Sequence, residues 1–395
     1  MNSSLLSEEV QEYINANLST DIHKILLKKS PFNDVSSKEV VEQIESKLKC
    51  KQKLPTWFAT KNIYYPNKLN LSQSSSEKTA RYKAALVKGD SIVDCTAGLG
   101  VDCVAFSKQM QQVVHLEKNE ELSTIAQHNF KTLGIENIEC LSEDSISFLK
   151  NSSKSYDWIF IDPSRRDSVN NKVYYLSDCE PDVTKHMGLL FSKSSNLLIK
   201  TGPLLDLSVG LNQLPNVKEI HIVAINNDVK EVLWILQRDY CKEPLIKTLN
   251  FKNNTEQVFE FKPSEESASV ATYGNPEKYL YEPNAAILKS GAFQYIGSYY
   301  QLNKLHPNSH LYTSSQLIQF PGRIFKILNV IDYSKKSIKK LNLSKANIST
   351  RNFPDSVETI RKKLKLQAGG ESYVFCTTDI DQNLTLLICD QIFVI

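Results

Sequence analysis

The chain has 395 residues, of which 41% are hydrophobic and 23% are charged, and its formal net charge is +3 at pH 7. This composition is typical of a soluble globular protein of two or three domains, because one hydrophobic core rarely serves so many residues. It excludes a protein that binds nucleic acid through its overall charge, so any basic surface has to be local.

The N-terminus and the cysteines indicate where the protein is located and which kinds of site it lacks. The first nine residues lack a basic segment followed by an apolar one, and no apolar run approaches the roughly 18 residues of a membrane span. The eight cysteines form no C-x-x-C pair and lie mostly within apolar runs. We therefore expect a cytoplasmic protein with no membrane segment, no disulfide framework and no metal site.

Residues 1–72 show helical periodicity and are expected to form a helical N-terminal region. Ser36 and Glu39 have the spacing of a capping box, which starts one of these helices. The stretch 54–71 is rich in aromatic residues and prolines and is expected to be extended. A second capping box, formed by Ser74 and Glu77, is expected to begin a helix that leads into the first strand.

Residues 91–102 are the centre of the sequence pattern. Ile92 and Val93 form a short apolar strand that ends at Asp94, and a Thr-Ala-Gly-Leu-Gly turn then leads into a helix that begins at Val101. Glycine lets the backbone take unusual conformations, and a helix start offers N–H groups without partners. This stretch therefore predicts a site for a nucleotide-like ligand.

Strands and helices alternate downstream, as in a parallel βα array. The further strands are expected at 113–116, 138–141, 158–161, 196–199, 220–224 and 257–261. We therefore expect an α/β fold with a Rossmann-like, doubly wound sheet of up to seven strands over residues 73–270, whose ligands bind beyond the strand C-termini. Acidic residues follow four of the strands in order: Asp94, Glu117, Asp144 and Asp162.

Two ligand classes use a strand, a glycine turn and an acid on the next strand. The dinucleotide fingerprint needs a small residue where this chain has Cys103, and Asp102 would repel a pyrophosphate. S-adenosylmethionine has no phosphate and carries a sulfonium cation, so carboxylates are tolerated beside it. The pattern favours S-adenosylmethionine, and a nicotinamide dehydrogenase is the weaker alternative.

The acids at the strand ends have separate expected roles. Glu117 can accept hydrogen bonds from both ribose hydroxyls, and Asp144 can accept one from the adenine amino group. Either residue alone could equally be a solvated acid at a strand end, but four such acids in order are harder to dismiss. The residues expected to bind the cofactor are Asp94, Thr96, Ala97, Gly98, Gly100, Asp102, Glu117, Asp144 and Asp162.

The chain resembles the class I S-adenosylmethionine-dependent methyltransferases over roughly residues 75–262. Its glycine turn is similar to the D-x-T-A-G-L-G-x-D motif of a bacterial family of ribosomal RNA guanine-N2 methyltransferases. Nearly the full length resembles a Bacteroidetes family of proposed RNA methyltransferases. The segments that carry this second resemblance are 75–84, 162–167, 352–357 and 361–366. This resemblance implies a ferredoxin-like segment over 276–323 and a small α+β, THUMP-like domain over 324–395.

The segment after the fourth strand sets the chemistry to expect. Amino-group methyltransferases commonly carry Asp, Asn or Ser, then two prolines and an aromatic residue, which orient the target amine and stack on its base. This chain keeps Asp162 and Pro163 but has Ser164 and Arg165 at the other positions. Arginine can stack on a base or hold a phosphate, or it can simply pair with a nearby carboxylate. Asp162, Pro163 and Arg165 are therefore the expected catalytic residues.

A local basic region lies in the C-terminal tail, where residues 335–365 contain ten Lys or Arg against Asp355 and Glu358. Such charges usually cover a solvated face, yet this excess would suit phosphate contacts. We therefore predict a methyltransferase that acts on structured RNA (rRNA or tRNA), at a guanine exocyclic amine, and binds it through this tail. The alternative is an RNA-binding protein with the methyltransferase fold and little or no turnover.

Overall fold

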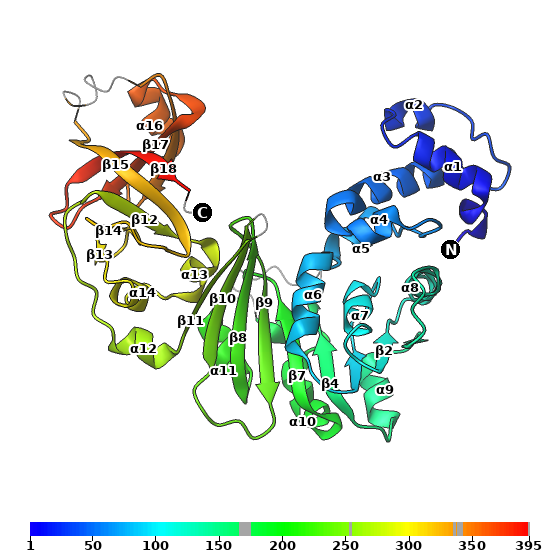
Figure 1. The fold of residues 1–395 in the computed structure, drawn as a ribbon. Helices are drawn as coiled ribbons and strands as arrows, with labels where there is room; N and C mark the ends of the chain where they lie inside the picture. Colours follow the sequence, from blue (N-terminus) through cyan, green and yellow to red (C-terminus); the bar gives the residue numbers. More distant parts are fainter. Residues whose placement is uncertain (166–174, 253–254, 335–336, 338–342, 394–395) are drawn as a thin grey trace. The chain divides into compact units, whose positions relative to one another are not determined.

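The structure is a computed structural model, and it describes residues 1–165, 175–252, 255–334, 337 and 343–393 (Figure 1). The described chain divides into two compact units. One comprises residues 1–217 and 234–241, and the other comprises 218–233 and 242–395. None of the described helices combines the length and the apolar character that a membrane crossing requires.

The N-terminal region is helical, as predicted. Its elements are η1 (Ser3–Leu6), α1 (Glu8–Ala16), α2 (Ile22–Leu26), α3 (Ser37–Lys53), α4 (Pro55–Ala59), α5 (Lys68–Gln73) and α6 (Glu77–Leu86). The Ser36–Glu39 capping box is confirmed at the start of α3. The prediction of an extended stretch over 54–71 is wrong in part, because a proline opens α4 and the Asn67 side chain caps α5.

The start of α6 differs from its prediction by two residues. Ser76 is the N-cap, and it forms the capping box with Thr79 rather than Ser74 with Glu77. Glu77 instead accepts hydrogen bonds from the backbone and the hydroxyl of Thr56 in α4, at 2.7 and 2.9 Å. Three successive serines offer three possible caps, and the contact with α4 favours the last of them.

The large sheet has the strand order β11-β10-β8-β9-β7-β4-β1-β2-β3 over the described residues. Its strands are β1 (Ser91–Asp94), β2 (Gln112–Leu116), β3 (Ile138–Leu141), β4 (Tyr156–Ile161), β7 (Ser194–Thr201), β8 (Val217–Ile225), β9 (Asp228–Gln237), β10 (Leu245–Lys252) and β11 (Thr255–Phe261). The pairs β1/β2, β1/β4, β2/β3 and β4/β7 are parallel. The helices between them are α7 (Val101–Phe106), α8 (Glu120–Thr132), α9 (Ser145–Asn151), α10 (Val183–Lys193) and α11 (Leu207–Gln213). The predicted α/β fold class is confirmed.

The sheet contains two strands that the sequence pattern did not reveal, β9 and β10. Asn226 and Asn227 both have positive φ angles and join β8 to β9 in a two-residue turn, a conformation that asparagine tolerates well. In β10, Thr248 and Asn250 are buried and bond to β11 through Phe259 O and the Gln257 side chain. Buried polar residues interrupt the apolar pattern by which a strand is recognised.

A second sheet has the order β13-β14-β12-β15-β18-β17-β16. Its strands are β12 (Tyr279–Pro283), β13 (Asn303–Lys304), β14 (Tyr312–Ser314), β15 (Gly322–Asp332), β16 (Lys345–Arg351), β17 (Gln367–Thr378) and β18 (Leu384–Ile392). The helices of this part are α12 (Pro263–Ala268), α13 (Ala285–Ser290), α14 (Tyr295–Tyr299) and α16 (Val357–Leu364). Because β15 pairs with both β12 and β18, the expected ferredoxin-like and THUMP-like segments share one sheet.

Gly100 is the residue of the glycine turn that packing constrains most. Its φ angle is +81°, and a Cβ atom on it would lie 2.2 Å from Cζ of Phe130. Gly134 has a similar φ angle of +70° but nothing within 4 Å of that position. Gly100 therefore combines backbone strain with a collision, whereas Gly134 has the strain alone.

We expect Gly134→Ala to lower the free energy of unfolding by about 1 kcal/mol. Gly100→Ala should lower it by about 2–4 kcal/mol, because overpacking adds to the strain. Urea denaturation of both variants measures the difference. Equal losses would show that Phe130 moves aside at no cost.

Candidate active site

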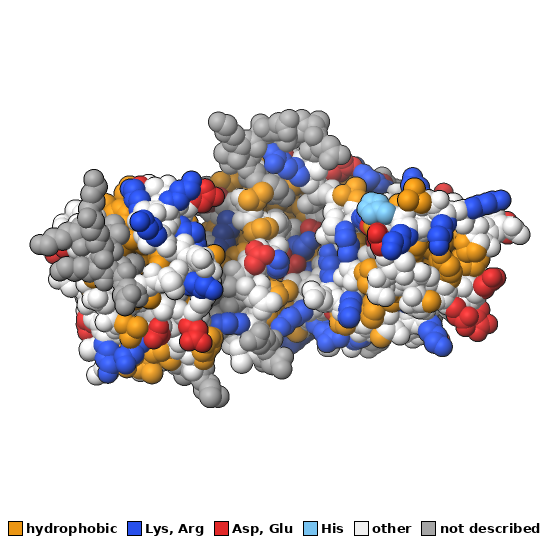
Figure 2. All heavy atoms as spheres, turned by 90° about the horizontal axis from the view of Figure 1, so that it is seen from above, with side chains coloured by type: hydrophobic (Ala, Val, Ile, Leu, Met, Phe, Trp, Pro, Cys, Tyr) orange, Lys and Arg blue, Asp and Glu red, His pale blue; other side chains and the backbone are white. Residues whose placement is uncertain are grey.

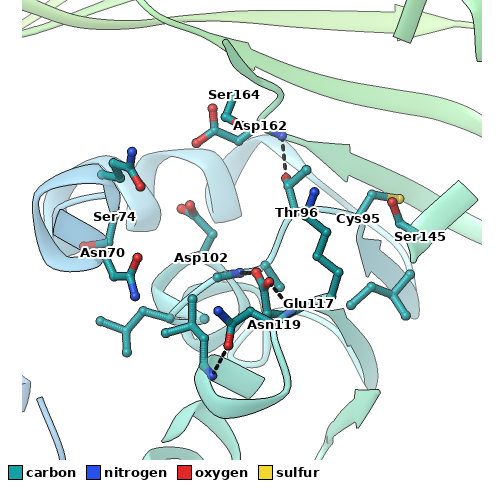
Figure 3. Close-up of a pocket in the computed structure, with 18 of the residues that line it drawn as sticks. Asn70, Ser74, Cys95, Thr96, Asp102, Glu117, Asn119, Ser145, Asp162 and Ser164 are labelled. Carbon is teal, nitrogen blue, oxygen red and sulfur yellow. Dashed lines mark hydrogen bonds between the residues drawn. The ribbon is translucent and has the colours of Figure 1, made fainter. Parts of the chain in front are cut away.

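A cavity of about 550 Å³ opens at the C-terminal ends of β1, β2, β3, β4 and β7. Parallel strands present these ends at one edge of the sheet, where ligands of doubly wound folds bind. Figure 3 shows side chains from several of these ends directed into the cavity. Of the residues predicted to bind the cofactor, eight line it: Thr96, Ala97, Gly98, Gly100, Asp102, Glu117, Asp144 and Asp162.

Glu117 is held at the end of β2 by two backbone groups. Gly98 N donates to its Oε2 at 3.1 Å, and Asn119 N donates to its Oε1 at 2.7 Å. The neighbouring His115 side chain is fully buried and bonds through Nε2 to Gly98 O at 3.0 Å. Since a carbonyl only accepts, Nε2 carries the proton, and burial lowers the pKa of His115 to about 4. A neutral imidazole and a carboxylate thus fix the glycine turn.

Asp94 does not line the cavity, although it was predicted to bind the cofactor. Its side chain is 1% exposed and accepts hydrogen bonds from Thr96 N at 3.0 Å and from Cys103 Sγ at 3.3 Å. Burial, followed by the nearby charge of Asp102, raises the pKa of Asp94 to about 8. Asp94 therefore bonds to the turn from its buried side, away from the cavity, and is mostly neutral at pH 7.

Asp102 lines the cavity but is paired with a lysine. Lys83 Nζ, which is fully buried, lies 3.0 Å from Asp102 Oδ1. Ser75 Oγ accepts from Lys83 Nζ at 2.8 Å and donates to Asp102 Oδ2 at 2.7 Å. The sequence analysis missed this network. The sequence does contain a signal for it, because Lys83 lies three or four positions from Thr79 and Ala80 and therefore on the same buried face of α6. A buried lysine requires a partner for its charge.

Only some of the carboxylates in the cavity give it negative charge, because the others are paired with lysines. The described residues that line it include six acids (Asp102, Glu117, Glu143, Asp144, Asp162 and Glu180) and two lysines, Lys118 and Lys200. Three of the acids form ion pairs, with Lys83, Lys118 and Lys200. The remaining three, Glu117, Glu143 and Asp144, have no such pair within the described chain. The walls at the ends of β2 and β3 are therefore the negative part of the site.

Asp144 lines the cavity at the end of β3 and also begins the next helix. It is the N-cap of α9, where its Oδ1 accepts from Ser147 N at 2.9 Å. That hydrogen bond lowers the pKa of Asp144, so the residue stays ionised. Ser145 and Cys95 line the same part of the cavity (Figure 3).

The three predicted catalytic residues follow β4, but only Asp162 lines the cavity. The backbone N of Asp162 donates to Thr96 Oγ1 at 2.7 Å, and its carboxylate is ion-paired with Lys200. Pro163 is buried, and neither it nor Arg165 lines the cavity, whereas Ser164 does. Ser164 and Arg165 form the short strand β5, which pairs with β6 (Cys179–Glu180). Successive side chains of a strand point to opposite faces, which explains why only Ser164 lines the cavity.

The N-terminal region also contributes to the wall through Asn70, Gln73, Ser74 and Ser75. The sequence analysis placed none of the four in the site, because it did not recognise α5 and treated Ser74 only as a helix cap. No motif marks them, since the only local signal is the Asn67 cap that begins the helix. Among the described residues, no cluster of His, Cys, Asp or Glu has the arrangement of a metal site.

Comparison with known proteins identifies the family. Family models match residues 77–181 (conserved hypothetical protein 95), 279–321 (ferredoxin-like domain) and 322–391 (THUMP domain-like). The crystal structure of a "putative methyltransferase" from Porphyromonas gingivalis W83 is similar with a TM-score of 0.90 and 33% sequence identity, and the alignment covers 99% of both chains. The chain belongs to this methyltransferase family.

More distant relatives agree with the family assignment. Two strains of Mycobacterium tuberculosis, CDC 1551 and H37Rv, have a protein named an uncharacterized S-adenosylmethionine-dependent methyltransferase. Each is 21% identical to the present methyltransferase over 304 residues, which cover 75% of this chain and 80% of the relative. The predicted family of S-adenosylmethionine-dependent methyltransferases is thereby confirmed.

The buried Asp94 predicts how the stability of this methyltransferase depends on pH. Its pKa rises from 3.8 to about 8 on folding, so the stability it contributes is present at low pH and is lost as the pH rises toward 8. His115 acts in the opposite sense, but only between its folded pKa of about 4 and its ordinary value of 6.5. Between pH 6.5 and 8, Asp94 therefore contributes more than His115 to the change in stability.

We therefore expect the free energy of unfolding of the wild-type protein, relative to that of Asp94→Asn, to fall by about 2 kcal/mol from pH 6.5 to pH 8. Groups other than Asp94 contribute to both proteins alike and cancel in this difference. Urea denaturation at several pH values in this interval measures both slopes. Identical slopes would mean that Asp94 is already ionised in the folded protein.

Proposed function

We propose that this methyltransferase transfers a methyl group from S-adenosylmethionine to structured RNA (rRNA or tRNA), at a guanine exocyclic amine. The observation that carries the proposal is the arrangement of carboxylates in one cavity: Glu117 and Asp144 on its negative side, and Asp162 at the end of β4. The first two suit the uncharged nucleoside part of a phosphate-free cofactor. The third suits an amine that receives the methyl group.

The residues of the cavity fit the cofactor. Backbone contacts hold the Glu117 carboxylate in place, so its oxygens are set to accept from the two ribose hydroxyls. At Gly98 a Cβ atom would meet only Thr96 O, at 3.9 Å, so the turn leaves open space for a ligand beside its backbone. The negative wall would repel a pyrophosphate, which argues against a dinucleotide. When bound, S-adenosylmethionine supplies a methyl group on a positively charged sulfur.

Asp162 is suited to orient the acceptor amine. Lys200 pairs with its Oδ2, and its Oδ1 makes no hydrogen bond to any described residue. Its backbone N is fixed to Thr96 in the glycine turn, at 2.7 Å. Asp162 is thus tied to the loop that would hold the cofactor. A carboxylate in that position accepts an N–H from the amine and directs its nitrogen, and such positioning supplies much of the rate in a transfer of this kind.

Charges in the C-terminal region support RNA as the substrate. Six of its ten basic residues are described, and the other four (Lys335, Lys336, Lys339 and Lys340) lie outside the described residues. Of the six, Arg351 pairs with Glu282 and Lys363 pairs with Asp355. Lys345, Lys362 and Lys365 are exposed and form no ion pair with a described residue. In Figure 2, Lys and Arg side chains stand among acidic and apolar ones on the visible surface.

We expect the triple variant Lys345→Ala/Lys362→Ala/Lys365→Ala to bind RNA more weakly across all sequences. The slope of log affinity against log salt should become less steep by about 2–3, roughly one for each lost phosphate contact. Lys363→Ala is the matched control, since Lys363 already pairs with Asp355. Filter binding at several salt concentrations measures the slopes. An unchanged slope in the triple variant would contradict RNA binding by these lysines.

The reaction itself is tested by mass spectrometry of nucleosides. Total RNA from cells without the protein should lack one methylated nucleoside, and wild-type protein with S-adenosylmethionine should restore it in vitro. Asp162→Asn should reduce methyl transfer by about 100-fold or more while S-adenosylmethionine binding, followed by calorimetry, stays within a few fold. If wild-type and null RNA carry the same nucleosides and the protein still binds RNA, the alternative of a binding protein without turnover is correct.

A further inference from the structure

One wall of the cavity has no role in the function proposed above. Helix α5 supplies Asn70 and Gln73, three positions apart, which places both amides on one face of the helix. Ser74, its C-cap, lines the cavity beside them. In Figure 3, Asn70 and Ser74 lie on the side of the cavity away from Cys95 and Ser145 at its β3 end.

The two amides have hydrogen-bonding capacity that the folded chain leaves unused. Neither the Asn70 nor the Gln73 side chain bonds to a described residue, whereas Asn67 in the same segment caps the helix by accepting from Asn70 N at 2.9 Å. Asn70 is half-buried and Gln73 is exposed, so water can reach both. Each amide therefore offers one acceptor and two donor hydrogens to a molecule that enters the cavity.

Helix α5 is held in place by a buried side chain and by hydrogen bonds to its backbone. Leu71 is fully buried, and Lys53 Nζ from the end of α3 donates to Leu71 O at 2.6 Å and to Ser72 O at 3.0 Å. Ser75, which follows the C-cap of α5, is buried and donates to Asp102 Oδ2 at 2.7 Å, so the end of the helix is also fixed to the start of α7. Asn70 and Ser74 lie across the cavity from Ser145, which follows Asp144, the residue expected to bind adenine. The two amides thus lie away from the adenine end, on the side proposed for the acceptor.

We propose that Asn70 and Gln73 bind the acceptor base and determine which base the enzyme accepts. An enzyme that acts on a base within folded RNA takes it out of the stack and reads its Watson–Crick edge by hydrogen bonds. Guanine presents O6 as an acceptor next to N1–H as a donor, and one carboxamide complements both. Its exocyclic amine then remains for Asp162. This inference rests on the proposed function, because it requires a nucleobase as the acceptor.

The variants Asn70→Ala and Gln73→Ala test the inference. The assay is transfer of a labelled methyl group from S-adenosylmethionine to total RNA from cells that lack the protein. We expect KM for RNA to rise by about 10- to 100-fold in each variant. Affinity for S-adenosylmethionine, measured by calorimetry, should stay within twofold. Asn70→Asp, which keeps the oxygen and loses the donor, should be as defective as Asn70→Ala.

Ser72→Ala is the matched control on the same helix, since Ser72 is exposed and does not line the cavity. Its KM should equal that of the wild-type protein. If either amide variant loses S-adenosylmethionine affinity in parallel with activity, the residue belongs to the cofactor site and the inference is overturned. Variants with wild-type KM overturn the inference and leave the proposed function intact. Wild-type protein that methylates no RNA overturns both.

Discussion

The turn between β1 and α7 is the constraint on which the rest of the site depends. The turn follows β1, and its backbone bonds to two further strands: Cys95 N to Phe160 O of β4 at 2.9 Å, and Ala97 N to Leu116 O of β2 at 3.0 Å. Gly98 N also bonds to the side chain of Glu117, which follows β2. Because the strands are parallel, these contacts bring three strand ends to one point. A shift of the turn would therefore move Glu117 and Asp162 together.

The charges around this turn are arranged so that neither of its two acids is left as an unpaired buried charge. Asp94 and Asp102 lie close enough to repel each other, and the structure resolves the conflict in two ways. Asp94 is buried and holds a proton, while Asp102 is paired with Lys83 through a direct contact and through Ser75. An unpaired buried charge would cost several kcal/mol. Negative charge is thereby left to residues at the cavity wall, where a cationic ligand benefits from it.

The two sides of the cavity come from different parts of the chain. The ends of β1, β2 and β3 form the side that suits a nucleoside, and these elements follow one another within about fifty residues. The side that we propose for the acceptor combines Asp162, Lys200 and helix α5, whose sequence positions span some 130 residues. A side built from distant segments can change its substrate without any change in the glycine turn.

The sequence by itself determined the α/β class, the glycine turn and the order of acids at the strand ends, because the C-termini of parallel strands must meet at one edge. It also predicted that Glu117 and Asp144 would reach the same cavity. Only the tertiary structure decided that Asp94 lies beneath the turn, that Lys83 neutralises Asp102, and that α5 completes the wall. Local patterns report which face of an element is buried; the partner of a buried charge is set by contacts between segments far apart in the chain, which no local pattern records.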